Sequence, residues 1–155
     1  MKKINIVLYE PEIPQNTGNI SRTAAVTGAA LHLIKPFGFE ISDRTLKRAG
    51  LDYWDKLEIT YYENFADFME RNPEAELYFF SAHAEKNYAE VDYPDGCYLV
   101  FGKETAGLPR ELIESNPERA VRIPMRKTLR CLNLSNAVAV AVYEALRQGG
   151  CEGLE

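Results

Sequence analysis

Short runs of Val, Ile, Leu, Tyr and Phe alternate with helix-forming segments along the whole chain. The strand-like runs span residues 4–9, 31–34, 57–62, 77–81, 97–101 and 120–123. Several are apolar at nearly every position, as in strands buried on both faces of a parallel sheet. Helices are expected at about 18–28, 42–49, 64–71, 109–115 and 133–148. The alternation predicts an α/β fold, a single-domain open parallel sheet of about six strands with helices on both faces.

The length and composition fit one domain spanning residues 1–155, with the last few residues as a short tail. Of the 155 residues, 46% are hydrophobic and 26% are charged, as in ordinary globular proteins. No apolar run approaches the length that spans a bilayer. Residues 1–9 pass into the first predicted strand without a small-residue cleavage site, unlike a signal peptide. We therefore expect a cytoplasmic location and no membrane contact.

Cysteines and histidines are few and scattered. Cys97, Cys131 and Cys151 lie far apart, and His32 and His83 are isolated. Structural metal sites and disulfide frameworks use closely spaced or paired ligands, so we expect neither. Each histidine is expected to be a surface residue or a hydrogen-bonded core residue.

The charge of the chain is unevenly distributed. The net charge is −5, which disfavours binding of nucleic acid by bulk charge. Residues 58–95, however, carry ten acids and two bases, whereas residues 119–130 carry five bases and no acid. The basic segment could simply be solvated, but it could equally supply the phosphate contacts of an otherwise acidic protein.

The last predicted helix is apolar on every side over residues 137–142. The strict alternation of Ala and Val there could also mark a strand, but Asn133 and Ser135 offer N-cap chemistry and favour a helix. A helix without a polar face must be covered all round. A second subunit could supply that cover, and burial within one chain is the alternative.

Three segments follow predicted strands and therefore fall at the carboxyl edge of the sheet, where open α/β sheets bind ligands. They are residues 10–22, 101–109 and 123–136. In the first, Asn16 or Thr17 can cap the following helix. In the second, Gly102 would let a ligand approach the backbone closely. The glycine spacings of phosphate loops and dinucleotide sites are both missing, which disfavours those enzyme classes.

These segments are similar to the three motifs of the SPOUT (SpoU–TrmD) RNA methyltransferases. The matching stretches are 16–22 (NTGNISR), 101–108 (FGKETAGL), and 123–125 (IPM) with 132–138 (LNLSNAV). Three more, 8–14 (LYEPEIP), 48–53 (RAGLDY) and 142–145 (VYEA), resemble the minimal tRNA (cytidine/uridine-34-2′-O)-methyltransferases. The resemblance runs from residue 4 to about 149.

The resemblance implies a cofactor, a knot and an assembly. The cofactor would be S-adenosyl-L-methionine, contacted at the positions of Phe80, Gly102, Ile123 and Cys131. Further residues of the cofactor pocket or its motifs would be Glu104, Met125, Leu132, Asn133 and Ser135. The chain departs from its relatives at Cys131, where they usually have Ser. A C-terminal trefoil knot and a homodimer packed through the last helix are also implied.

The implied reaction moves a methyl group to a ribose 2′-hydroxyl, a weak nucleophile. The enzyme must align the two groups and favour the alkoxide as it forms. Arg22 is the candidate catalytic residue, because its permanent charge can stabilise the alkoxide or hold the adjoining phosphate; Glu104 is the weaker option. No metal is needed. Contacts with the tRNA anticodon stem-loop are expected from Asn16, Arg126, Lys127, Arg130 and Tyr143. For Tyr143, packing in a dimer interface is an equal alternative.

Other functions remain open from the sequence. The same fold could methylate rRNA or another tRNA position instead of C34 or U34, or serve as a non-catalytic RNA-binding module. An α/β enzyme with another adenine-containing cofactor is a third class. The three intact motifs favour the methyltransferase.

Overall fold

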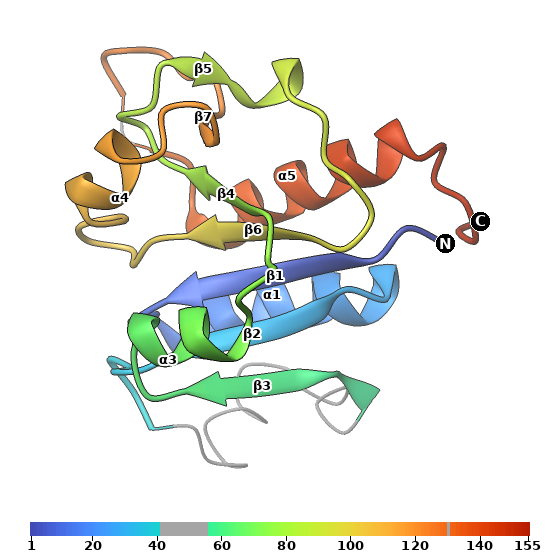
Figure 1. Ribbon diagram of the computed structural model, residues 1–155, viewed down its shortest axis with the longest axis horizontal. Helices are drawn as coiled ribbons and strands as arrows, with labels where there is room; N and C mark the ends of the chain where they lie inside the picture. Colours follow the sequence, from blue (N-terminus) through green and yellow to red (C-terminus); the bar gives the residue numbers. More distant parts are fainter. Residues whose placement is uncertain (41–55, 130) are drawn as a thin grey trace.

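The computed structural model describes residues 1–40, 56–129 and 131–155. Within them, seven parallel strands form one sheet in the order β3-β2-β1-β6-β4-β7-β5 (Figure 1). The strands are β1 Ile4–Tyr9, β2 Ala30–Ile34, β3 Ile59–Tyr62, β4 Leu77–Phe80, β5 Lys86–Asn87, β6 Cys97–Phe101 and β7 Ala120–Arg122. The helices are α1 Pro14–Thr27, α3 Phe65–Arg71, α4 Arg110–Glu114 and α5 Leu134–Gln148, with a 3₁₀ turn η2 at Tyr88–Glu90.

The predicted α/β class with a parallel sheet is confirmed, and the strand count needs one correction. The described residues contain seven strands instead of about six. The additional strand, β5, has only two residues, Lys86 and Asn87, and pairs with β7 at the edge of the sheet. A strand so short and polar has no apolar pattern to reveal it. The helix expected at 42–49 lies outside the described residues.

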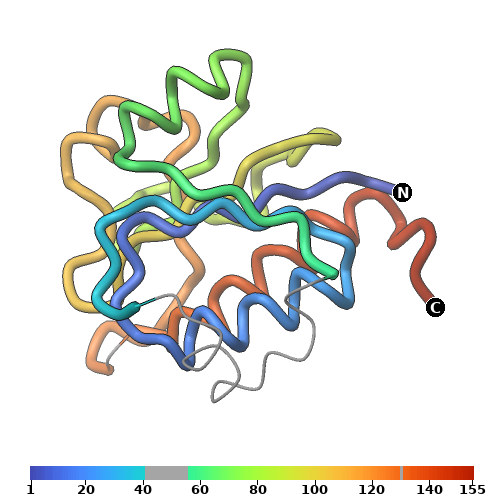
Figure 2. Tube along the Cα trace, turned by 90° about the horizontal axis from the view of Figure 1, so that it is seen from below, coloured from blue at the N-terminus to red at the C-terminus, as the bar shows by residue number. Residues whose placement is uncertain are grey.

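Alternate residues of the central strands face two separate cores. In β1, Ile4, Ile6 and Leu8 belong to the core that includes α1 and α5, whereas Val7 belongs to the core that includes α3 and α4. Figure 2 shows α1 and α5 side by side along one face of the sheet and α3 on the other. This alternation follows from the two-residue period of a strand. Helices on both faces are therefore required to cover the sheet.

The start of α1 differs from the prediction. The helix begins at Pro14, four residues before the expected start, and Ile13 at the N-cap makes no side-chain cap hydrogen bond. Capping by Asn16 or Thr17 was wrong, because both lie inside the first turn and are buried. Proline suits the first helical position, since its φ is fixed near the helical value and the missing N–H has no partner there anyway.

Helix α5 begins as predicted, with Asn133 at its N-cap accepting a hydrogen bond from Ser135 N at 2.9 Å. Its inner face, including Ala141, is fully buried in the chain's own core. Its outer face is open, with Val140 38% and Tyr143 48% exposed. Within the described part of the chain, this helix is thus covered on one side only.

A chain of buried polar side chains crosses the sheet on the side of α3. His32 Nδ1 lies 2.8 Å from the Tyr62 hydroxyl, and His32 Nε2 lies 3.0 Å from Asn5 Oδ1. Asn72 donates to the Tyr62 hydroxyl at 3.1 Å and accepts from the Tyr98 hydroxyl at 3.3 Å. Both ring nitrogens of His32 are therefore satisfied, which confirms it as a hydrogen-bonded core residue.

Acid should destabilise the fold through His32. Burial lowers the pKa of this imidazole from 6.5 to about 4. Between those pH values the unfolded chain binds a proton that the folded chain does not, so stability falls as the pH falls from 6.5 towards 4. From pH 7 to pH 5 the expected loss is about 2 kcal/mol. Urea titrations at both pH values measure it. In His32→Gln the difference should shrink, and an unchanged difference would show that other groups cause it.

Candidate functional site

Strand pairing gathers the three motif-bearing loops at the carboxyl edge of the sheet. Leu8 of β1 pairs with Phe101 of β6, Phe101 pairs with Phe80 of β4, and Phe80 pairs with Val121 of β7. The loops after β1 and β6 therefore start beside one another, and the loop after β7 starts two strands from β6, beyond β4. The order of strands reverses at β1, which lies between β2 and β6, and ligands of open α/β sheets bind at such switch points.

A cavity of about 570 Å³ lies between these loops. All four predicted cofactor contacts line it, namely Phe80, Gly102, Ile123 and Cys131. It is also lined by Asn16, Glu104, Met125, Leu132 and Asn133 from the other predicted residues, and by Ser81, His83 and Thr105, which sequence reasoning missed. Volume and mixed lining are those of a small-molecule site.

Gly102 is required by the loop itself. A Cβ at this position would lie 2.1 Å from backbone atoms of Gly107 and Leu108. The loop folds back on Gly102 through a hydrogen bond from Gly107 N to Lys103 O at 2.8 Å, and Gly107 has φ 67°. The chain's own backbone therefore requires glycine at this position, and the ligand access expected from the sequence stays a prediction.

Glu104 binds backbone groups of the first loop. Its carboxylate accepts from Glu12 N at 2.8 Å and from Ile13 N at 3.1 Å. Its Oε1 also lies 3.4 Å from Asn16 Nδ2. A carboxylate with these partners is well placed to hold two loops together. Its geometry favours that role over proton abstraction.

Asn16 joins all three loops. It is 5% exposed, and its amide reaches Glu104 on one side and accepts from Asn133 Nδ2 at 3.0 Å on the other. Asn133 Oδ1 in turn accepts from the backbone and hydroxyl of Ser135. The amide of Asn16 is thus hydrogen-bonded within the protein, and the RNA contact expected from the sequence stays a prediction.

None of the cationic candidates in the described residues is part of the cavity wall. Arg126 and Lys127 are exposed in the loop after β7. Arg22 is exposed on α1 and, among the described residues, is not part of the cavity lining. It lies about two turns after the start of α1, because the helix begins at Pro14. Arg130 lies outside the described residues.

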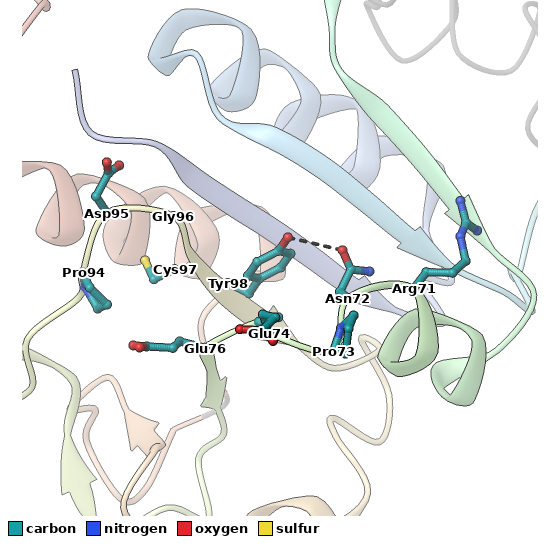
Figure 3. Close-up of a pocket in the computed structure, with 11 residues that line it drawn as sticks. Arg71, Asn72, Pro73, Glu74, Glu76, Pro94, Asp95, Gly96, Cys97 and Tyr98 are labelled. Atoms are coloured by element: carbon teal, nitrogen blue, oxygen red, sulfur yellow. Dashed lines mark hydrogen bonds between the residues drawn. The ribbon is translucent and has the colours of Figure 1, made fainter.

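A second hollow, of about 410 Å³, opens at the opposite edge of the sheet (Figure 3). It is formed by residues 71–76, which lead into β4, and residues 94–98, which lead into β6. The Tyr98–Asn72 hydrogen bond at its wall is the outer end of the His32 chain. Because it lies at the amino ends of the strands, the cavity at the carboxyl edge is the better candidate for a functional site.

Among the residues that the structure describes, no helix is both long and apolar enough to cross a membrane. No group of three or more His, Cys, Asp or Glu side chains there is arranged to hold a metal ion.

The fold and the cavity define the class of protein: an open α/β protein with a cofactor-sized site built by three loops at the carboxyl edge of its sheet. Comparison with known families makes this specific. The model of the SpoU rRNA Methylase family matches residues 3–143. The chain belongs to this family of SPOUT methyltransferases, as its motifs predicted.

Individual relatives agree with the family assignment. The tRNA (cytidine(34)-2′-O)-methyltransferase of Escherichia coli K12 is 48% identical over 151 residues, which cover 97% of this chain and 96% of the relative. A solved structure concerned with the 2-OH methylation of C/U34 on tRNA has a TM-score of 0.90 and 46% identity, covering 97% of this chain and 99% of that one. An AdoMet-bound rRNA methyltransferase from Sinorhizobium meliloti has a TM-score of 0.82 and 27% identity, covering 95% of this chain and 57% of that one.

Proposed function

We propose that this protein transfers a methyl group from S-adenosyl-L-methionine to the ribose 2′-hydroxyl of the wobble nucleotide, C34 or U34, in the tRNA anticodon loop. The observation that carries the proposal is the cavity at the carboxyl edge, which the three motif loops enclose. Hydrogen bonds between Asn16, Glu104 and Asn133 join these loops. The relative from Escherichia coli, similar over nearly its whole length, supports the substrate and position.

The cavity suits the proposed cofactor. Phe80, Ile123 and Leu132 offer apolar surface for an adenine ring, while Asn133 and Glu104 add polar groups. Phe80, Gly102, Ile123 and Cys131 would hold the cofactor, which, when bound, supplies a methyl group activated as a sulfonium. At position 131 the hydroxyl of the usual Ser is replaced by a thiol, a weaker hydrogen-bond donor.

The protein's own residues must hold the RNA and favour the alkoxide. Arg22 is the proposed catalytic residue, acting by charge on the alkoxide or on the adjoining phosphate. Arg126, Lys127 and Arg130 would contact phosphates, and Tyr143 would stack or donate a hydrogen bond. The basic loop after β7 adjoins the cavity, so phosphate contacts there would bring the target ribose close to it.

The proposal includes an assembly and a location. The open face of α5 would pack against a second copy to form a homodimer, because an apolar helix face such as that at Val140 gains stability when it is covered. The family's trefoil knot would lie in the C-terminal part, and tRNA as the substrate implies the cytoplasm.

Cofactor binding should raise the melting temperature. S-adenosylhomocysteine at 100 times its Kd should add about 2.7 kcal/mol of stability, a shift of roughly 5–10 °C for a domain of this size. NAD and ATP should give no shift. Leu132→Asp, at a cavity residue 42% exposed, should abolish the shift, while Leu129→Asp, at a position 68% exposed in the same loop, should keep it. A shift with NAD alone would contradict the proposed cofactor.

The substrate is tested with the same protein. Radiolabelled methyl transfer to total tRNA, followed by mass spectrometry of nuclease fragments, should place the methyl group on nucleotide 34. Methylation of rRNA or of another tRNA position would support the alternative substrates. RNA binding without transfer would support the non-catalytic module.

A further inference from the structure

The loops after β1 and β6 are joined by two glutamates, each of which accepts hydrogen bonds from the other loop. Glu104, in the loop after β6, accepts from the backbone N–H groups of Glu12 and Ile13. Glu12, in the loop after β1, accepts from Thr105 N at 3.0 Å and from the Thr105 hydroxyl at 2.8 Å, both through Oε1. Each loop thus satisfies backbone donors of the other. We call Glu12, Glu104 and Thr105 the two-glutamate clasp.

The clasp compensates two negative charges that lie close together. The N–H and hydroxyl of Thr105, followed by the charge of Lys103, lower the pKa of Glu12 below its usual value. Lys103 Nζ also lies 3.8 Å from Glu10 Oε1 in the same loop as Glu12. Glu12 is therefore ionised at neutral pH, and hydrogen bonds to an ionised acceptor are stronger than neutral ones.

Glu12 does not itself face the cavity. Glu104 and Thr105 line the cavity, whereas Glu12, among the described residues, is not part of its wall. Any influence of Glu12 on a bound molecule must therefore pass through its clasp partners. One of them, Glu104, also contacts Asn16 and through it Asn133, so the clasp is continuous with the third loop.

We propose that Glu12 is a positioning residue for methyl transfer: by holding Thr105 it fixes the loop of residues 102–107 against the start of α1, and so fixes the cavity wall relative to the helix that carries Arg22. This rests on the proposed function. Transfer between a bound cofactor and a ribose depends on alignment, and a misplacement of about 1 Å can cost about 100-fold in rate.

The test compares variants of the full-length protein. Glu12→Ala should lower kcat for tRNA methylation by about 10–100-fold, with KM for tRNA changed less than about threefold because Glu12 touches no predicted RNA contact.

Glu12→Gln, which keeps an acceptor oxygen, should recover most of the rate, as should Thr105→Ser compared with Thr105→Val. Combining Glu12→Ala with Thr105→Val should be no less active than the less active single variant, because Thr105→Val removes a hydroxyl whose acceptor Glu12→Ala has already removed. Glu114→Ala, at an exposed carboxylate on α4 outside the clasp, is the matched control and should be unchanged.

A second readout needs neither cofactor nor RNA. In Glu12→Ala the amide of Thr105 loses its acceptor, so its hydrogen exchange should become at least about tenfold faster, while exchange in β1 and β6 stays as in the wild type. Undiminished kcat in Glu12→Ala, with an active wild type, would overturn the positioning role alone. Unchanged exchange at Thr105 would overturn the clasp. A wild type that transfers no methyl group would overturn the proposed function, and the positioning role with it, even if the exchange result stands.

Discussion

Arg22→Ala should nearly abolish methyl transfer, lowering kcat by about 10²–10³-fold, as removal of one charge-stabilising donor does in other enzymes. Arg22 is exposed on α1 and, within the described residues, lies outside the wall of the cavity. Its loss should therefore leave folding and the affinity for S-adenosylhomocysteine close to wild type. Single-turnover methylation, with cofactor affinity from calorimetry, measures both effects.

Two controls separate the possible roles of Arg22. Arg22→Lys should recover little, because one ammonium does not reproduce the planar, multi-donor guanidinium. If Arg22 only binds phosphate, saturating tRNA should restore the rate of Arg22→Ala; if it stabilises the alkoxide, saturation should not help. Turnover close to wild type in Arg22→Ala would exclude both roles and direct attention to Glu104.

The fold could be predicted because most of its strands coincide with apolar runs in the sequence. Strands such as β1 and β6 are buried on both faces, so nearly every residue had to be apolar, and the pattern showed their parallel class and all but one of the strands. Strand β5, at Lys86 and Asn87, could not be found in this way. The start of α1 was missed for a different reason, since Pro14 can stiffen a loop or begin a helix, and only the packing of the helix decides.

The candidate site could be predicted as three loops but not as a network. Phe80, Gly102, Ile123 and Cys131 came from resemblance to a family, and the structure brings all four to one cavity. The clasp was not predictable, because its hydrogen bonds depend on β6 lying next to β1, although four strands come between them in the chain. A glutamate between two prolines, as at Glu12, is a weak signal without that neighbour.

The hydrogen bonds of Asn16 also depend on tertiary contacts that the sequence does not reveal. From the sequence, Asn16 is predicted to contact RNA, and this stays a prediction. Burial to 5% exposure and hydrogen bonds to Glu104 and Asn133 give it a part in the framework of the cavity as well. Polar motif residues can thus serve to fix loops relative to one another, and only tertiary contacts distinguish this from direct recognition.

Val140→Glu should convert the proposed homodimer to a monomer without unfolding it. Val140 is 38% exposed on the open face of α5, so in an isolated chain the carboxylate would remain in water at little cost. In a dimer packed through this face it would be buried without a partner, at a cost of several kcal/mol. Ala141→Glu would not test this, because Ala141 is fully buried in the chain's own core.

Light scattering at micromolar concentration should therefore give the mass of a dimer for the wild type and of a monomer for Val140→Glu, with the same far-UV circular dichroism. Met69→Glu is the matched control: Met69 is 41% exposed on α3, on the opposite face of the sheet, and this variant should remain dimeric. Arg22 lies outside the cavity wall, and α1, which carries it, packs beside α5. If the partner subunit completes the site next to Arg22, dissociation of the dimer should therefore also lower methyl transfer. A wild type that is monomeric at this concentration would refute the proposed assembly.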